Sequence, residues 1–184
     1  MGVSRYAPYY CEENVWYLAQ DDRFKGFECI VAIITGLGPR RPLWYQRAAE
    51  HEELPVWWDY HVILLYRDLS WMVWDPDTIL DLPVDAIEYL RKTFLDDAES
   101  VESADVVFRL INAEEYVLTF SSDRSHMKLS GGRWIAPPPP WPPILQGPYP
   151  ILHQLLDVSI KTPGKLITLA ELLRKLCTIA TLTD

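Results

Sequence analysis

The sequence has few cysteines, no long apolar run and no excess of basic residues, and each lack argues against a class of protein. Only three cysteines occur in 184 residues, which indicates a reducing compartment, cytosolic or nuclear, rather than a disulfide-stapled secreted fold. No run of eighteen apolar residues is present, so we expect no membrane-spanning helix. The 17 basic residues stand against 26 acidic ones, a net charge of -9, which argues against binding to nucleic acid or an anionic membrane.

Metal-binding and phosphate-binding motifs are also missing. No C-x-x-C or H-x-x-x-H pair occurs, and GLGPR at residues 36–40 resembles a phosphate loop only superficially because it does not open a helix. No G-x-S-x-G elbow is present. The sequence therefore predicts no metal site. Residues 1–10 contain no apolar core, so we also expect no signal peptide.

The hydrophobic pattern predicts one mixed domain of helices and strands over residues 1–184. Hydrophobic residues make up 49% of the chain, enough for a sizeable core at this length. The predicted fold class is α/β or α+β. We expect helices at 11–22, 83–95, 113–120, 151–156 and 169–177, the last opened by a Thr168–Glu171 capping box, and strands at 28–35, 43–48, 57–66, 70–75 and 105–111.

A proline-rich stretch interrupts this pattern. Eight of the fifteen prolines lie between residues 137 and 150, which favours polyproline II or turns over helix or sheet. We interpret the stretch as a loop laid over the domain surface. The alternative is a ligand for an SH3 or WW module, which would make the chain a catalytically silent adaptor.

Cys11 is the candidate nucleophile of a thiol hydrolase. It opens the first predicted helix, where unpaired backbone N–H groups favour a thiolate and could hold an oxyanion. Cys29 lies inside an apolar strand and Cys177 inside the last helix, positions typical of structural cysteines. Such an enzyme also needs a histidine base and a group that orients the base.

His61 and Asp75 are the candidates for the base and for the group that orients it. His61 begins an apolar strand, where solvent exposure does not explain a histidine. A hairpin centred on residue 68 would make the two residues direct cross-strand neighbours on one face. A register slip of one residue would separate them, and Asp77 is then the rival acid. A weaker polar cluster, containing Asp123 and His126, follows the segment 113–120.

Five segments resemble the protein N-terminal glutamine amidohydrolase family, in the family's order and over about residues 9–142. These segments are YYCEENVW at 9–16, VWWDYHVILL at 56–65, WDPDTIL at 74–80, FSSDRSHM at 120–127 and PPPPWP at 137–142. The resemblance implies an α-β-α sandwich related to the transglutaminase and papain-like thiol enzymes. It also implies a monomer without a cofactor, and a Cys-His-Asp triad at Cys11, His61 and Asp75.

The resemblance further implies deamidation of N-terminal glutamine to glutamate with release of ammonia. An arginyltransferase could then modify the product for degradation by the N-degron route. Such an enzyme must recognise a free α-ammonium, and the candidate residues for substrate binding are Glu12, Glu13, Tyr60, Asp77 and Asp123. A transglutaminase, a thiol peptidase and the silent adaptor remain as alternatives.

Overall fold

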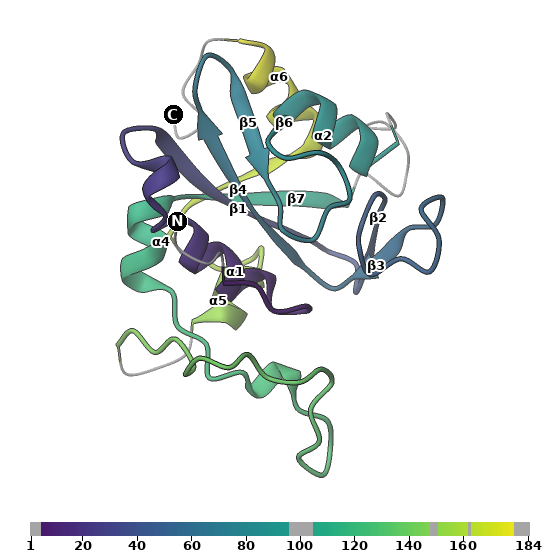
Figure 1. Cartoon of the computed structure of the whole chain (residues 1–184), viewed down its shortest axis with the longest axis vertical. Helices are drawn as coiled ribbons and strands as arrows, with labels where there is room; N and C mark the ends of the chain where they lie inside the picture. The colour runs from purple at the N-terminus through teal and green to yellow at the C-terminus, as the bar shows by residue number, and fades with distance from the viewer. Residues whose placement is uncertain (1–4, 96–104, 148–150, 162, 179–184) are drawn as a thin grey trace.

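A six-stranded, wholly antiparallel sheet forms the centre of the molecule in the computed structural model, which describes residues 5–95, 105–147, 151–161 and 163–178 (Figure 1). Across the sheet the strands lie in the order β6 (Val84–Asp85), β5 (Trp71–Trp74), β4 (His61–Arg67), β1 (Glu28–Gly36), β7 (Val106–Asn112) and β8 (Lys165–Thr168). A separate pair, β2 (Arg41–Leu43) and β3 (Val56–Trp58), forms a small second sheet.

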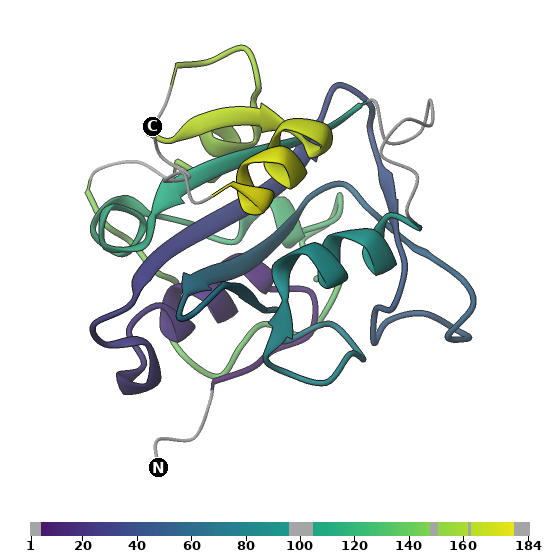
Figure 2. The same ribbon diagram turned by 90° about the horizontal axis from the view of Figure 1, so that it is seen from above.

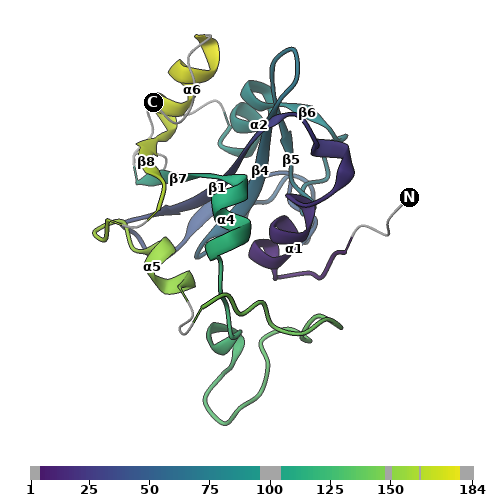
Figure 3. The same cartoon turned by 90° about the vertical axis from the view of Figure 1, so that its left-hand side faces the viewer.

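Helices cover both faces of the central sheet. On one face lie α2 (Ala86–Thr93) and α6 (Leu169–Cys177), and on the other lie α1 (Cys11–Leu18), α4 (Ala113–Thr119) and α5 (Leu152–Leu156) (Figures 2 and 3). Alternate residues of a strand point to opposite faces, so the sheet supports two hydrophobic cores. The structure therefore confirms a mixed fold in which helices flank a mainly antiparallel sheet.

Several predicted elements are confirmed almost to the residue. The predicted strands at 28–35 and 105–111 correspond to β1 and β7, and the predicted helices at 113–120 and 169–177 correspond to α4 and α6. At the start of α6 the Thr168 hydroxyl accepts from the Glu171 backbone N–H, and the Glu171 carboxylate accepts from the Thr168 N–H. Both partners of the predicted capping box are thus in place.

Other predicted elements are wrong in extent, two of them at an aspartate that competes for backbone hydrogen bonds. The helix predicted at 11–22 ends at Leu18, because Asp21 caps a separate 3₁₀ turn, Asp22–Phe24. The strand predicted at 57–66 is broken between β3 and β4, where the Asp59 carboxylate accepts from the backbone N–H of the next residue. Of the strand predicted at 43–48, only Leu43 is in a strand.

The helix predicted at 83–95 begins three residues late. Val84 and Asp85 first form β6, and the Asp85 carboxylate then caps α2 by accepting from the N–H groups of Ile87 and Glu88. The short strand β8 was not predicted. In the part of the chain that the structure describes, no helix is long and apolar enough to cross a membrane.

The proline-rich stretch forms no helix or regular strand over residues 137–147, as predicted, while residues 148–150 lie outside the described part. The loop lies beyond α1 and α5, alongside the 3₁₀ turn Ser125–Met127 (Figure 1). The Trp141 indole N–H donates to the Glu13 carboxylate of α1 at 2.6 Å. This anchorage supports the interpretation of the stretch as a surface loop.

Candidate active site

The predicted catalytic residues lie at the end of the sheet where β4 begins. Cys11 is the first residue of α1, which packs against β4, and its side chain is almost fully buried, with the residue 5% exposed. The backbone N–H of Val62 points at the thiol, and Val62 directly follows His61 in the chain. The first turn of α1 thus places the thiol against the start of the strand that carries the imidazole.

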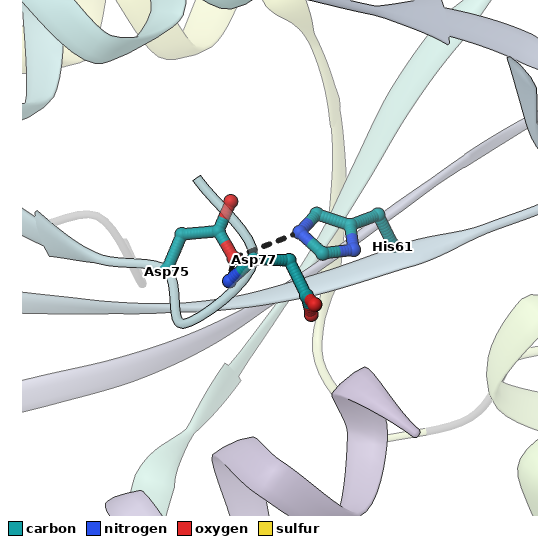
Figure 4. Close-up of side chains that lie close together, drawn as sticks. All are labelled: His61, Asp75 and Asp77. Carbon is teal, nitrogen blue, oxygen red and sulfur yellow. Dashed lines mark hydrogen bonds and ion pairs between the residues drawn. The ribbon is translucent and has the colours of Figure 1, made fainter. Parts of the chain in front are cut away.

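His61 and Asp75 form a buried pair on the sheet face that α2 covers (Figure 4). The His61 Nε2–H donates to Asp75 Oδ1 at 3.0 Å. The Tyr89 hydroxyl, from α2, donates to Asp75 Oδ2 at 2.8 Å, and the Asp77 backbone N–H donates to Oδ1 at 2.9 Å. These donors fix the carboxylate, and the carboxylate in turn fixes the orientation of the imidazole.

The pair forms although the predicted hairpin register is wrong by two residues. The structure pairs Leu64 with Trp74 and Arg67 with Trp71, so the hairpin is centred one residue later than predicted. His61 and Asp75 therefore lie beyond the paired part of the hairpin and are not direct cross-strand neighbours. A shift of two residues preserves the face to which a side chain points, whereas a shift of one reverses it.

Burial and charge act against each other in this pair. Burial alone would lower the pKa of His61, but the Asp75 carboxylate, helped by Asp77 and Glu12, raises that pKa above its ordinary value. Burial would raise the pKa of Asp75, but His61 and the donated hydrogen bonds hold it below its ordinary value. The pair therefore favours an ionised Asp75 and an imidazole that readily accepts a proton.

The second ring nitrogen of His61 is not engaged by a protein group in the described part of the chain. Nδ1 is buried and has no hydrogen-bond partner among the described residues. The Trp58 indole stacks on the imidazole with ring centroids 5.8 Å apart and an interplanar angle of 19°. The Trp58 indole N–H is also buried and unpartnered within the described part of the chain, so it is available to a bound ligand.

The thiol of Cys11 lies in acidic surroundings. Burial raises its pKa well above the ordinary value, Glu12 and Asp77 raise it further, and the Val62 N–H only partly offsets them. The expectation that the helix N-terminus would give Cys11 a low pKa is therefore wrong for the free protein. A thiol in this state needs a base to become a nucleophile.

A pocket with a volume of about 220 Å³ opens beside Cys11. Its lining includes the aromatic residues Trp57 and Trp58 of β3, together with His126 and Met127. Tyr60, predicted to bind substrate, also lines the pocket, and its hydroxyl is hydrogen-bonded to His126 Nε2 at 3.1 Å. The pocket brings Tyr60 and His126 together next to the thiol.

Glu12 is buried beside this pocket. The residue is 0% exposed, and its Oε2 accepts from the Cys11 thiol at 3.7 Å. Oε1 has no hydrogen-bond partner among the described residues, although His126 Nε2 lies 3.4 Å away. The Tyr60 hydroxyl is also directed at this carboxylate, so the groups beside Glu12 are His126 and Tyr60, both of which line the pocket.

Asp77 lies next to the pair but serves other contacts. It accepts from the Tyr6 hydroxyl at 2.7 Å, and its carboxylate turns away from that of Asp75 (Figure 4). Burial raises its pKa. Potential ligand atoms of His61, Asp75 and Asp77 lie within 4.8 Å of one another, close enough for a metal, but each residue is already hydrogen-bonded to a protein group.

Asp123 lies outside the pocket. It is exposed and accepts from the Ser125 backbone N–H at 2.9 Å, which is a turn contact. The structure thus brings Glu12, Tyr60 and Asp77 near the thiol or the imidazole but does not do so for Asp123. Sequence reasoning missed Tyr89, because a tyrosine within an amphipathic helix gives no signal that its hydroxyl will reach a carboxylate.

Glu13 also points away from the pocket and binds Arg124. Its two oxygens accept from Arg124 Nε at 2.6 Å and Nη2 at 2.7 Å, and the side chains are 0% and 4% exposed. Together with Trp141, this bidentate pair ties α1 to the loop that carries His126 and to the proline-rich segment. The contacts indicate a structural role for Glu13.

We expect Glu13→Gln to destabilise the protein by roughly 3 kcal/mol, because it leaves Arg124 buried without a counter-charge. Urea unfolding of the two proteins at neutral pH measures this difference. Glu115→Gln, an exposed change on α4, is the matched control and should alter stability by less than about 0.5 kcal/mol. Equal stability of Glu13→Gln and the control would contradict the structural role.

A buried thiol packs at the start of the strand that carries a buried imidazole–carboxylate pair, and these are the residue types that a thiol hydrolase requires. Comparison with known proteins gives the family. The model of the N-terminal glutamine amidase family matches residues 6–176. The chain belongs to this family.

Curated relatives agree with the family match. The chain is 37% identical over 166 residues to a Drosophila virilis protein named protein N-terminal glutamine amidohydrolase, covering 87% of this chain and 80% of the relative. It is 36% identical over 176 residues to the Drosophila melanogaster protein of the same name, covering 90% and 85%.

Proposed function

We propose that this protein hydrolyses the side-chain amide of an N-terminal glutamine, giving N-terminal glutamate and ammonia. The observation that carries the proposal is the open Nδ1 of His61, which is held by Asp75 at the start of the strand against which Cys11 packs. The family and the names of the relatives supply the substrate. The catalytic residues of the proposal are Cys11, His61 and Asp75.

The first half-reaction transfers the acyl group to sulfur. His61 Nδ1 takes the proton from the Cys11 thiol, and the sulfur attacks the carboxamide carbon to form a tetrahedral oxyanion. The Cys11 backbone N–H, at the start of α1, donates to this oxyanion. The C–N bond then breaks, the His61 imidazolium gives its proton to the departing nitrogen, and ammonia leaves a thioester.

The second half-reaction returns the enzyme to its starting state. His61 takes a proton from water while the water oxygen attacks the thioester carbon. The C–S bond breaks, glutamate leaves, and the imidazolium reprotonates the Cys11 sulfur. Asp75 stays ionised throughout and holds His61 in one orientation.

The finer features of the proposal follow the family resemblance. The enzyme acts as a monomer without a cofactor in the cytosol or nucleus, on a scaffold related to transglutaminases and papain-like enzymes. Its product, an N-terminal glutamate, is the kind of substrate that an arginyltransferase takes.

The test is ammonia release from two peptides that differ only in acetylation of an N-terminal glutamine. We expect release from the free peptide alone, and none from a third peptide with an internal glutamine. Equal release from the free and acetylated peptides would be consistent with a thiol amidase but would contradict specificity for a free N-terminus. Absence of release from every peptide would refute the proposed function and favour the adaptor.

A further inference from the structure

We propose that Glu12 is the receptor for the α-ammonium of the substrate, and that the ammonium, once bound, relieves an electrostatic block on Cys11. This inference rests on the proposed function and adds the residue that distinguishes an N-terminal glutamine from an internal one. Glu12 directly follows Cys11, so the first turn of α1 would carry both the nucleophile and the specificity residue.

The carboxylate of Glu12 has the properties of an incomplete ion-binding site. It is fully buried, and its Oε1 has no hydrogen-bond partner among the described residues. A buried carboxylate oxygen without a donor is costly, so a ligand that supplies a charged N–H donor there gains strongly. The Tyr60 hydroxyl interacts with the same carboxylate, and His126 Nε2 lies 3.4 Å from Oε1 and pairs with it when protonated. Both side chains line the pocket, so a substrate ammonium that enters there would join or displace these two neutral or weakly held partners.

The other candidate acids near α1 are already occupied. Glu13 accepts from Arg124 and Trp141 through both oxygens. Asp75 accepts from His61 and Tyr89, and Asp77 accepts from Tyr6. Among the acids considered from the sequence, Glu12 alone combines burial, an oxygen that accepts no hydrogen bond in the described part of the chain, and contact with the nucleophile.

The dimensions of a glutamine residue fit this arrangement. Four covalent bonds separate the amide carbon from the α-nitrogen, so the two atoms lie at most roughly 5 Å apart. The thiol attacks from about 3 Å, and an ammonium binds a carboxylate oxygen at about 2.8 Å. The open oxygen Oε1 belongs to the same carboxylate as Oε2, which lies 3.7 Å from the Cys11 sulfur, so one bound glutamine can reach both groups.

The same proximity connects binding to reactivity. A carboxylate next to a thiol opposes formation of the thiolate, and Glu12 follows burial as the second cause that raises the pKa of Cys11. A substrate ammonium that pairs with Glu12 would cancel this charge where the thiolate must form. Substrates without the ammonium would leave the thiol protonated and the carboxylate unpaired.

The experiment compares a Gln-starting peptide with its desamino analogue, in which hydrogen replaces the α-amino group. We expect the wild-type protein to prefer the free amine by about 30-fold or more in kcat/KM, the range of a hydrogen bond to a charged group. In Glu12→Gln, which keeps the shape but removes the charge, we expect this ratio to fall at least tenfold. Iodoacetamide should also alkylate Cys11 faster in substrate-free Glu12→Gln than in substrate-free wild type at the same pH, because the thiolate forms more readily without the neighbouring charge.

Three outcomes would overturn the inference while leaving the proposed function intact. One is a wild-type protein that releases ammonia equally fast from both peptides, a result that needs no variant. Another is a Glu12→Gln protein that melts at the wild-type temperature but whose kcat/KM falls by the same factor on both peptides. Glu12 would then only position Cys11. The third is an unchanged preference in Glu12→Gln. Absence of ammonia release from wild type would instead refute the proposed function.

Discussion

Replacing Cys11 by Ala should reduce ammonia release from a Gln-starting peptide on the order of 10⁴-fold or more, because the proposed acyl-enzyme forms on its sulfur. Both remaining cysteines are poor substitutes. Cys29 lies in β1, where burial raises the pKa of its thiol to about 11. Cys177 is the last residue of α6. Steady-state ammonia release, with the circular dichroism spectrum as a check on the fold, measures the effect.

Cys29→Ala is the matched control for this prediction. It removes a sulfur of the same size from the same chain, and its Sγ makes only a long contact, 3.8 Å, to the Phe24 carbonyl. We expect it to keep the wild-type rate. Loss of activity in Cys29→Ala with retention in Cys11→Ala would show that the nucleophile was assigned to the wrong thiol.

The alternation of side chains along β4 explains why a wrong register still gave the right pair. The strand is buried on both faces: Ile63 and Leu65 lie on one, and Val62 and Leu64 on the other. In the sequence these residues form a continuous apolar run. This run predicts a buried strand but does not specify which residue lies opposite which. Both residues lie on one face because the predicted and the observed hairpin are each centred on a residue, 68 and 69, rather than between two residues.

The separate roles of Glu12 and Glu13 could not be predicted from the sequence. Both stand in the first turn of one helix, and either could cap that helix or bind a ligand. Their roles depend on Arg124, 111 residues away from Glu13, which takes one of the two carboxylates. Arg124 has a left-handed backbone, with φ of 61°, and this geometry appears only in the folded loop. Long-range contacts of this kind leave no local pattern.

Asp75→Asn should lower the rate on the order of 10³-fold, and Asp77→Asn should lower it far less. An asparagine can still accept from Tyr89, but it carries no charge to stabilise the imidazolium of His61. The Asp77 side chain influences His61 as a neighbouring charge, and its carboxylate accepts from Tyr6. The backbone N–H that Asp77 donates to Asp75 is kept in Asp77→Asn. Loss of activity in Asp77→Asn with a nearly normal Asp75→Asn would reverse the two assignments.

The pH profile separates an electrostatic role of Asp75 from a purely structural one. His61 must be neutral to accept the thiol proton, so kcat/KM should fall as the pH drops below the pKa of His61. In wild type Asp75 raises that pKa against the effect of burial. In Asp75→Asn that charge is gone, so burial should lower the pKa of His61 relative to wild type. The acid limb of the residual activity should therefore move to lower pH. An acid limb that stays in place while the rate falls would mean that Asp75 only supports the local fold.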